Sequence, residues 1–139
     1  METITLDEIL LLRLENKLND QYDWNNLCIN YILTEEIIER YEDKWNWDYI
    51  SQYQTLSEEF IEKYKDRVKW FNISKYQELS ESFIIKYKNK MFWYCICKYQ
   101  KLSESFIEKH KDRVNWTNIF ANQKLSDEFK EKYKCKLYH

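Results

Sequence analysis

One stretch decides the fold: residues 56–77 read LSEEFIEKYKDRVKWFNISKYQ. Its first half spaces apolar side chains four residues apart, which is the spacing of one helical face, at Leu56, Phe60, Tyr64 and Val68. Ser57 is a good N-cap, and the two glutamates after it suit the first turn of a helix, where the helix dipole favours anions. The first half therefore predicts one amphipathic helix.

The second half predicts another short helix, from about Trp70 to Gln77. Trp70 and Ile73 share one side of that helix, together with either Tyr76 or Gln77. In three repeats the residue directly before the equivalent tryptophan can serve as the N-cap of this second helix: Asp23, Asn46 and Asn115. Lys69 and Phe92 hold the same position and cannot cap in that way. The whole stretch is thus a helix–turn–helix.

The stretch recurs along the chain with a period of 23 residues. Leucines mark the first helix and tryptophans the second, at Leu33, Leu56, Leu79, Leu102 and Leu125 and at Trp24, Trp47, Trp70, Trp93 and Trp116. Helices this short persist only when a neighbouring pair covers their apolar face, and a fixed period in this range is typical of solenoids. A coiled coil or a plain bundle is the alternative, but 23 residues do not fit heptads.

We therefore predict an all-α solenoid of stacked short helix–turn–helix repeats, with five pairs and a C-terminal capping helix. It forms a single domain over residues 1–139, with repeats at about 10–32, 33–55, 56–78, 79–101 and 102–124 and a cap at 125–139. In the cap, Lys130 replaces the isoleucine found at Ile38, Ile61, Ile84 and Ile107, which suits a face without a further neighbour. At the other end, Thr5 and Glu8 predict a capping box, and Leu10, Leu14, Leu18 and Leu27 keep the repeat phase.

Composition excludes several classes of function. The chain has no glycine and no proline, which argues against phosphate-binding loops and Rossmann units. A net charge of −2 gives no general attraction to nucleic acid or to an anionic membrane. No apolar run is long enough to span a bilayer, and the first residues do not resemble a signal peptide. Four irregularly placed cysteines favour free thiols in a reducing, cytoplasmic setting.

Catalytic and metal-binding chemistry has little support in the sequence. His110 stands where other repeats have tyrosine, so we interpret it as a core position, and His139 is the last residue. Cys95 and Cys97 have the wrong spacing for a zinc knuckle, and no second ligand pair follows them. We therefore expect no enzyme activity, no cofactor and no metal.

The repeat wording, Leu-Ser-Glu-x-Phe-Ile followed by Trp-x-x-Ile-Ser-x-Tyr-Gln, resembles tandem repeats in proteins of large DNA viruses, phages and AT-rich bacteria. It is carried best by residues 56–77 and covers about residues 33–133. The resemblance implies a viral or phage origin, and hence the cytoplasm of a bacterium or an infected host cell. It also implies an anti-defence factor, including an inhibitor of the anti-CRISPR type.

Two surfaces are candidates for binding a partner. The repeat at 79–101 departs from the others with apolar side chains at expected surface positions, and with one residue of the preceding repeat these predict a protein contact site of Phe71, Ile85, Phe92 and Tyr94. The partner would be another protein or a ribonucleoprotein. Burial of these side chains within a differently packed repeat is the alternative.

The other candidate is a basic edge that could follow the phosphates of a nucleic acid. Two positions of the first helix carry cations in successive repeats, at Arg40, Lys63, Lys86 and Lys109 and at Lys44, Arg67, Lys90 and Arg113. Cations are also favoured at helix C-termini for purely structural reasons, and Glu58, Glu81 and Glu104 form an opposing acidic row. Self-association through an incompletely capped end is a further possibility.

Overall fold

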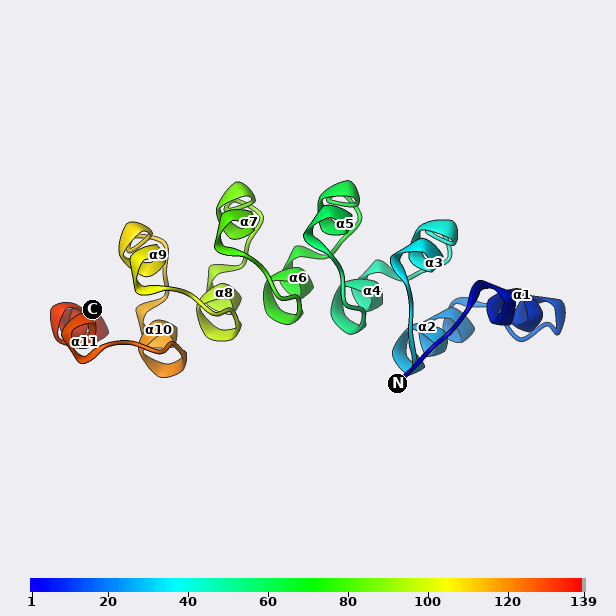
Figure 1. Ribbon diagram of the computed structural model, residues 1–139, viewed down its shortest axis with the longest axis horizontal. Helices are drawn as coiled ribbons and strands as arrows, with labels where there is room; N and C mark the ends of the chain where they lie inside the picture. Colours follow the sequence, from blue (N-terminus) through cyan, green and yellow to red (C-terminus); the bar gives the residue numbers. More distant parts are fainter. Residues whose placement is uncertain (139) are drawn as a thin grey trace. The chain divides into compact units, whose positions relative to one another are not determined.

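The computed structural model describes residues 1–138, and short α-helices dominate it (Figure 1). In chain order the elements are β1 (Glu2–Thr3), α1 (Leu6–Leu14), α2 (Gln21–Asn30), β2 (Tyr31–Ile32), α3 (Glu35–Arg40), α4 (Trp47–Tyr53), α5 (Glu58–Lys63), α6 (Trp70–Tyr76), α7 (Glu81–Lys86), α8 (Trp93–Tyr99), α9 (Glu104–Lys109), α10 (Trp116–Asn122), α11 (Asp127–Tyr133) and the 3-10 helix η1 (Lys134–Tyr138). The all-α class is confirmed, and residues 1–138 hold the five expected helix pairs and a final helix.

The chain divides into two compact units, residues 1–73 (unit 1) and residues 74 onward (unit 2). Within unit 1, α3 and α5 form one row and α2 and α4 another (Figure 1), and α2 packs against α4. Within unit 2, α7 and α9 form one row and α8 packs against α10 in the other. Each unit thus has the paired helices of a repeat protein. The continuous solenoid and the single domain stay predictions.

Side-chain caps fix where the helices begin. In every repeat from α3 onward the first helix follows a threonine or serine whose hydroxyl accepts a hydrogen bond from a backbone N–H three residues on, at Thr34, Ser57, Ser80, Ser103 and Ser126. Asn46 and Asn115 cap α4 and α10 as predicted, and the capping box of Thr5 and Glu8 begins α1. Phe92 precedes α8 without a side-chain cap, as expected.

The prediction that Asp23 is an N-cap is wrong. α2 begins at Gln21, one turn before Trp24, and its N-cap is Asp20. Asp23 occupies the third helical position, and its carboxylate accepts hydrogen bonds from the backbone N–H groups of Asn19 and Asp20, so it completes a capping box.

The first helix of each repeat is shorter than its apolar spacing suggested. α5 ends at Lys63, and the chain then folds into consecutive turns in which the Tyr64 carbonyl accepts hydrogen bonds from the backbone N–H groups of Arg67 and Val68 at 2.8 and 3.0 Å. Because these turns keep the residues close to the helix axis, Leu56, Phe60, Tyr64 and Val68 are still all buried, as predicted.

Isoleucines form the centre of both units. One set comes from the first helices and one from the second, and all are fully buried: Ile38, Ile61, Ile84 and Ile107, and Ile50, Ile73, Ile96 and Ile119. Lys130, which replaces isoleucine in α11, is exposed, in keeping with a terminal cap. At the other end, Leu10 and Leu14 keep the repeat phase in the sequence but are exposed, Leu14 by 74%, and Ile9 is the buried side chain of α1.

Buried glutamines join consecutive repeats. The Gln54 side-chain amide donates to the carbonyls of Cys28 and Tyr31 at 2.7 and 2.9 Å, and its oxygen accepts from the Leu33 backbone N–H at 2.8 Å. Gln100 and Gln123 make the equivalent three bonds within unit 2. Tyr31 stands one period before Gln54, where a glutamine would otherwise be, and there β1 pairs directly and in parallel with β2, with Thr3 opposite Ile32.

Candidate binding surfaces

The N-terminal end of α8 carries two exposed aromatic side chains. Phe92, the N-cap residue of α8, is 49% exposed, and Tyr94 in its first turn is 56% exposed. The Phe92 backbone N–H donates to Ser74 Oγ at 3.0 Å, while Cys95, Ile96 and Cys97 turn into the core. The backbone is thus fixed and the rings face solvent. In unit 1, Phe71 near the start of α6 is 48% exposed. The predicted exposure of these three rings is confirmed, whereas their role in binding stays a prediction.

Ile85 and Met91, from the same divergent repeat, are placed differently. Ile85 on α7 is half-buried. Met91 is buried, and its Sδ accepts a hydrogen bond from Ser74 Oγ at 3.6 Å. Met91 therefore belongs to the core of unit 2, and Ile85 contributes only part of its side chain to the surface.

Sequence reasoning missed a second exposed group on the same helices. Tyr76 and Tyr99, at the C-terminal ends of α6 and α8, are each 44% exposed, and Gln77 and Gln100 beside them are buried. The sequence spacing left open whether Tyr76 or Gln77 shares the buried side of the second helix, and in the structure Gln77 faces inward and Tyr76 outward. The recurring Tyr-Gln dipeptide marked the position, but its spacing alone did not decide which of the two side chains is buried.

Lysines lie against these tyrosines. Lys75 Nζ is 4.9 Å from the ring centroid of Tyr76 and 5.5 Å from that of Tyr99. Lys98 Nζ is 5.3 Å from the centroid of Tyr99 and 5.8 Å from that of Tyr94. A hydrogen bond with Tyr76 is the main cause that raises the pKa of Lys75, so it stays charged at neutral pH. Cations at this distance from aromatic faces are attracted by the ring quadrupole.

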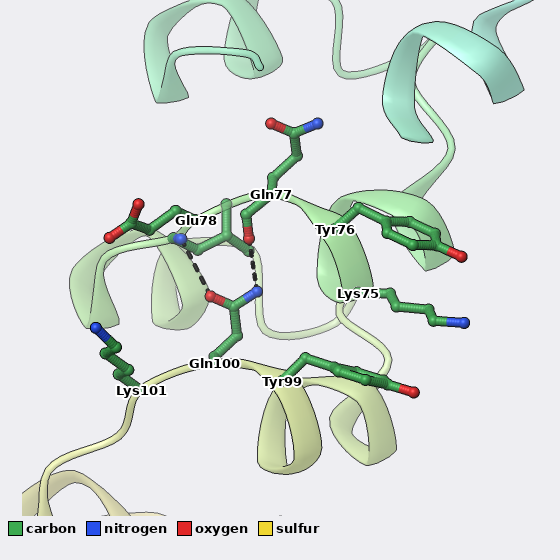
Figure 2. Close-up of a pocket in the computed structure, with 8 residues that line it drawn as sticks. Lys75, Tyr76, Gln77, Glu78, Tyr99, Gln100 and Lys101 are labelled. Atoms are coloured by element: carbon green, nitrogen blue, oxygen red, sulfur yellow. Dashed lines mark hydrogen bonds between the residues drawn. The ribbon is translucent and has the colours of Figure 1, made fainter. Parts of the chain in front are cut away.

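Two open pockets in unit 2 adjoin this arrangement. One, of about 320 Å³, lies between the segments 75–79 and 99–101, and the other, of about 580 Å³, lies between 98–103 and 122–124. Tyr99, Gln100 and Lys101 line both. Figure 2 shows Lys75, Tyr76 and Tyr99 pointing to the same side of the first pocket, with Gln100 hydrogen-bonded beneath the 77–79 segment. The pockets therefore form consecutive parts of one surface with a fixed floor.

The predicted basic edge is exposed, but several of its cations are bound to carboxylates of the preceding repeat. Lys63 pairs with Glu39, and Arg67 Nη1 lies 3.1 Å from Asp43 Oδ1 with its guanidinium 5.1 Å from the Trp47 ring centroid. Lys132 pairs with Glu108 in the same way. Arg113 lies over the ring of Trp93, and Lys86 lies over the ring of Tyr87. The side chains of Arg40, Lys44, Lys90 and Lys109 are exposed as well.

The acidic row has a structural role where it is described. Glu81 Oε1 accepts a hydrogen bond from the Ser103 backbone N–H at 2.7 Å, and Glu104 bonds the N–H of Ser126 in the same way. Each glutamate thus binds the cap residue of the next repeat. These carboxylates fix the stacking within unit 2, and they do not form a separate surface.

His110, interpreted from the sequence as a core position, is only half-buried, and its neighbours differ from those of the tyrosines in the other repeats. Glu108 binds both Lys132 and the Tyr133 hydroxyl, at 2.8 Å for the latter. One repeat earlier the glutamate is replaced by Ile85, and Lys109 and His110 face that side chain across an open pocket of about 340 Å³. Burial, together with Lys109, Lys88 and Arg113, lowers the pKa of His110, so the imidazole is neutral at neutral pH.

The three buried thiols are poor candidates for chemistry, whereas Cys135 is exposed. Burial raises the pKa of Cys28 and of Cys97 to about 11, and Cys95 is also buried with a raised pKa. Cys97 Sγ instead accepts a hydrogen bond from the Asn115 backbone N–H at 3.2 Å. Among residues 1–138 there is no cluster of three or more potential metal ligands and no helix long and apolar enough to cross a membrane. His139 lies outside the described residues.

The exposed surface of unit 2 therefore offers aromatic rings, ammonium groups and tyrosine hydroxyls, which can bind a partner without reacting with it. Sequence reasoning identified Phe92 and Tyr94 and overlooked Tyr76, Tyr99 and the lysines beside them. Comparisons of this chain with protein-family models, with curated proteins and with solved structures found no match.

Proposed function

We propose that this protein is a non-catalytic, protein-binding repeat scaffold that acts by covering a surface of its partner. The observation that carries the proposal is the exposure of Phe92 and Tyr94 on a backbone held rigid by the packing of α8. Large aromatic side chains on a rigid element lose little entropy on binding, and they dominate the energetics of protein interfaces. Within unit 2, Tyr76 and Tyr99 extend the aromatic surface.

The finer form of the proposal is inhibition of a host defence protein by a viral or phage factor. Its support is the resemblance of the repeat wording, together with the absence of any chemical requirement in an occluding inhibitor. The pKa of His110 is lowered mainly by burial, and its ring lies against those of Trp93 and Phe106, which suits a packing role. The buried, protonated thiols likewise argue for a binding role.

The alternative is nucleic-acid binding through the basic edge. The ion pairs of Lys63, Arg67 and Lys132 weigh against it, because each would have to be broken or shared before the cation could neutralise a phosphate. A salt titration separates the two functions, since phosphate binding weakens steeply with salt and an aromatic-centred protein interface does not.

The test is affinity capture from the lysate of the source cell, comparing the parent protein with the variant Phe92→Ala/Tyr94→Ala. The matched control is Tyr22→Ala/Tyr138→Ala, which removes two exposed aromatic rings elsewhere. We expect the parent and the control to retain the same protein, and the α8 variant to lose it, because each true hot spot contributes about 2 kcal/mol or more. Equal retention by all three proteins would refute a role for α8. A separate Phe71→Ala variant tests the ring in unit 1.

A further inference from the structure

Unit 2 carries a set of cations that is unlike the basic edge of the first helices. The two pockets beside Tyr76 and Tyr99 are lined by four lysines and one carboxylate: Lys75, Lys98, Lys101, Lys124 and Glu78. None of these lysines forms an ion pair with any side chain in the described part of the chain, residues 1–138. We call the surface made by the four lysines with Tyr76 and Tyr99 the lysine–tyrosine groove.

The charge of this groove is not a property of the repeat as such. One and two periods before Lys98 and Lys101 the chain has Lys75 and Glu78, and then Gln52 and Thr55, which carry no charge. The cations therefore accumulate in the last repeats only, in a chain whose net charge is −2. A local cationic surface on a nearly neutral protein attracts an anionic partner to that surface rather than to the molecule in general.

The geometry of the rings favours carboxylates over nucleic acid. Nucleic-acid bases bind tyrosine by stacking on the ring face. Here the face of Tyr99 is approached by the ammonium groups of both Lys75 and Lys98, at 5.5 and 5.3 Å from the ring centroid. What the groove presents to solvent is therefore a series of N–H and O–H donors, as the outward-pointing Lys75, Tyr76 and Tyr99 of Figure 2 show. Carboxylates accept charge-assisted hydrogen bonds from such groups.

The shape of the groove favours an extended chain. The two pockets are open to solvent and share Tyr99, Gln100 and Lys101, so they continue one another along the repeats. The floor is fixed because Gln100 makes three hydrogen bonds, to Ser74, Gln77 and Leu79. We infer that the lysine–tyrosine groove binds an acidic, extended segment of a partner protein. The inference rests on the proposed function, because it specifies the chemistry of one part of the partner.

The experiment measures fluorescence anisotropy with three labelled probes: a peptide rich in Glu and Asp, the same peptide with Gln and Asn in their place, and a single-stranded oligothymidylate. We expect the full-length protein to bind the acidic peptide, and to bind the amide peptide and the oligothymidylate more weakly. Failure to bind the acidic peptide would overturn the inference, and tighter binding of the oligothymidylate would assign the groove to nucleic acid.

Two quadruple variants make the test specific. Lys75→Gln/Lys98→Gln/Lys101→Gln/Lys124→Gln removes the cations of the groove, and Lys88→Gln/Lys109→Gln/Lys111→Gln/Lys130→Gln removes four exposed lysines of unit 2 outside it. We expect the groove variant to bind the acidic peptide at least about tenfold more weakly, since each exposed charge pair contributes up to severalfold, and the control to change about twofold or less. Equal losses in the two variants would show attraction by net charge alone and overturn the inference.

The hydroxyl groups have their own test. Tyr76→Phe/Tyr99→Phe keeps both rings and removes two donors, and we expect peptide binding to weaken about threefold or more. Unchanged binding would remove the tyrosines from the site. The inference and the proposed function fail separately: if the peptide does not bind but Phe92→Ala/Tyr94→Ala still loses a captured protein, only the acidic segment is wrong. If the peptide binds and that variant loses nothing, the role of α8 is wrong.

Discussion

Replacing Gln100 by leucine tests how unit 2 is held together. The Gln100 amide donates to the carbonyls of Ser74 and Gln77 at 3.0 and 2.7 Å, and its oxygen accepts from the Leu79 N–H at 3.1 Å. Leucine has nearly the same size but none of these bonds, so it leaves three buried backbone groups without a partner. Each such group costs about 1–3 kcal/mol, and we expect Gln100→Leu to lower the free energy of unfolding by about 3–9 kcal/mol.

Gln100→Glu separates the two halves of this arrangement. The carboxylate can still accept from Leu79, but at neutral pH it faces two carbonyl oxygens and has no donor for either. We therefore expect a loss at least as large as that of leucine at neutral pH, and a smaller one in acid, where the protonated carboxyl group can donate one bond.

The assay is urea unfolding followed by far-ultraviolet circular dichroism, with Gln123→Leu as the matched control. Gln123 makes the same three bonds but is only half-buried, so water can reach its partners and the loss should be smaller. If Gln100→Leu lost less than about 1 kcal/mol, the glutamines would not hold the repeats together, and the stability would have to come from the isoleucine core alone.

Three further predictions concern single side chains. The folded state lowers the pKa of His110, so the unfolded chain binds a proton more readily and the free energy of unfolding should fall as pH drops below about 6.5. His110→Tyr should remove this part of the pH dependence, measured by urea titrations at several pH values. An unchanged dependence of stability on pH would contradict the prediction. Lys130→Ile places an isoleucine on the exposed face of the cap and should cause self-association visible by light scattering, whereas Lys130→Gln should stay monomeric if the parent does. A thiol reagent should modify exposed Cys135 rapidly, and Cys28 and Cys97 only on unfolding, because burial raises the pKa of both to about 11; rapid labelling of Cys135→Ser would disprove this.

Local features of the fold were predictable because each depends on a few adjacent residues. The period of 23 residues located the helix pairs, since an apolar residue every fourth position and a serine or asparagine before it have direct local consequences. Ser57 and Asn115 are N-caps in the structure, and Lys130 is exposed where Ile107 is fully buried. These features need no knowledge of how one repeat lies on the next.

Features that join repeats could not be predicted in the same way. The spacing left open whether Tyr76 or Gln77 faces inward, and the answer depends on the backbone groups that a neighbouring repeat presents to the glutamine. The pairing of Lys63 with Glu39 joins residues 24 positions apart, so it follows from the stacking and not from local helix spacing. The pairing of β1 with β2 was missed because two-residue strands carry no recognisable pattern. Part of the candidate surface could not be predicted for the same reason, since Lys75 and Tyr99 come together only when consecutive repeats stack.

Departures from the repeat are of two kinds: some keep an internal hydrogen bond of the other repeats, and some lose one. Ser74 Oγ accepts the backbone N–H of Phe92, and Cys97 Sγ replaces that hydroxyl for Asn115, so the change from serine to cysteine keeps a bond. Ile85, by contrast, cannot keep the hydrogen bonds of the residue that it replaces. It replaces the glutamate that, at Glu108, binds both a lysine and a tyrosine of the next repeat.

The repeat at 79–101 combines that loss with two solvent-facing rings. Phe92 provides no side-chain hydrogen bond at the start of α8, whereas asparagine caps α4 and α10 at this position. Tyr94 exposes an aromatic ring where α4 has Asp48 and α10 has Thr117. Tyr94 makes a cation–π contact with Lys98 of the same helix, at 5.8 Å from the ring centroid, and still stays 56% exposed. Substitutions that cost a protein internal bonds are kept where they serve an activity. Restoring the repeat wording at residues 85, 92 and 94 should therefore strengthen the fold and weaken the binding of a partner, whereas a purely structural repeat would gain stability and lose nothing.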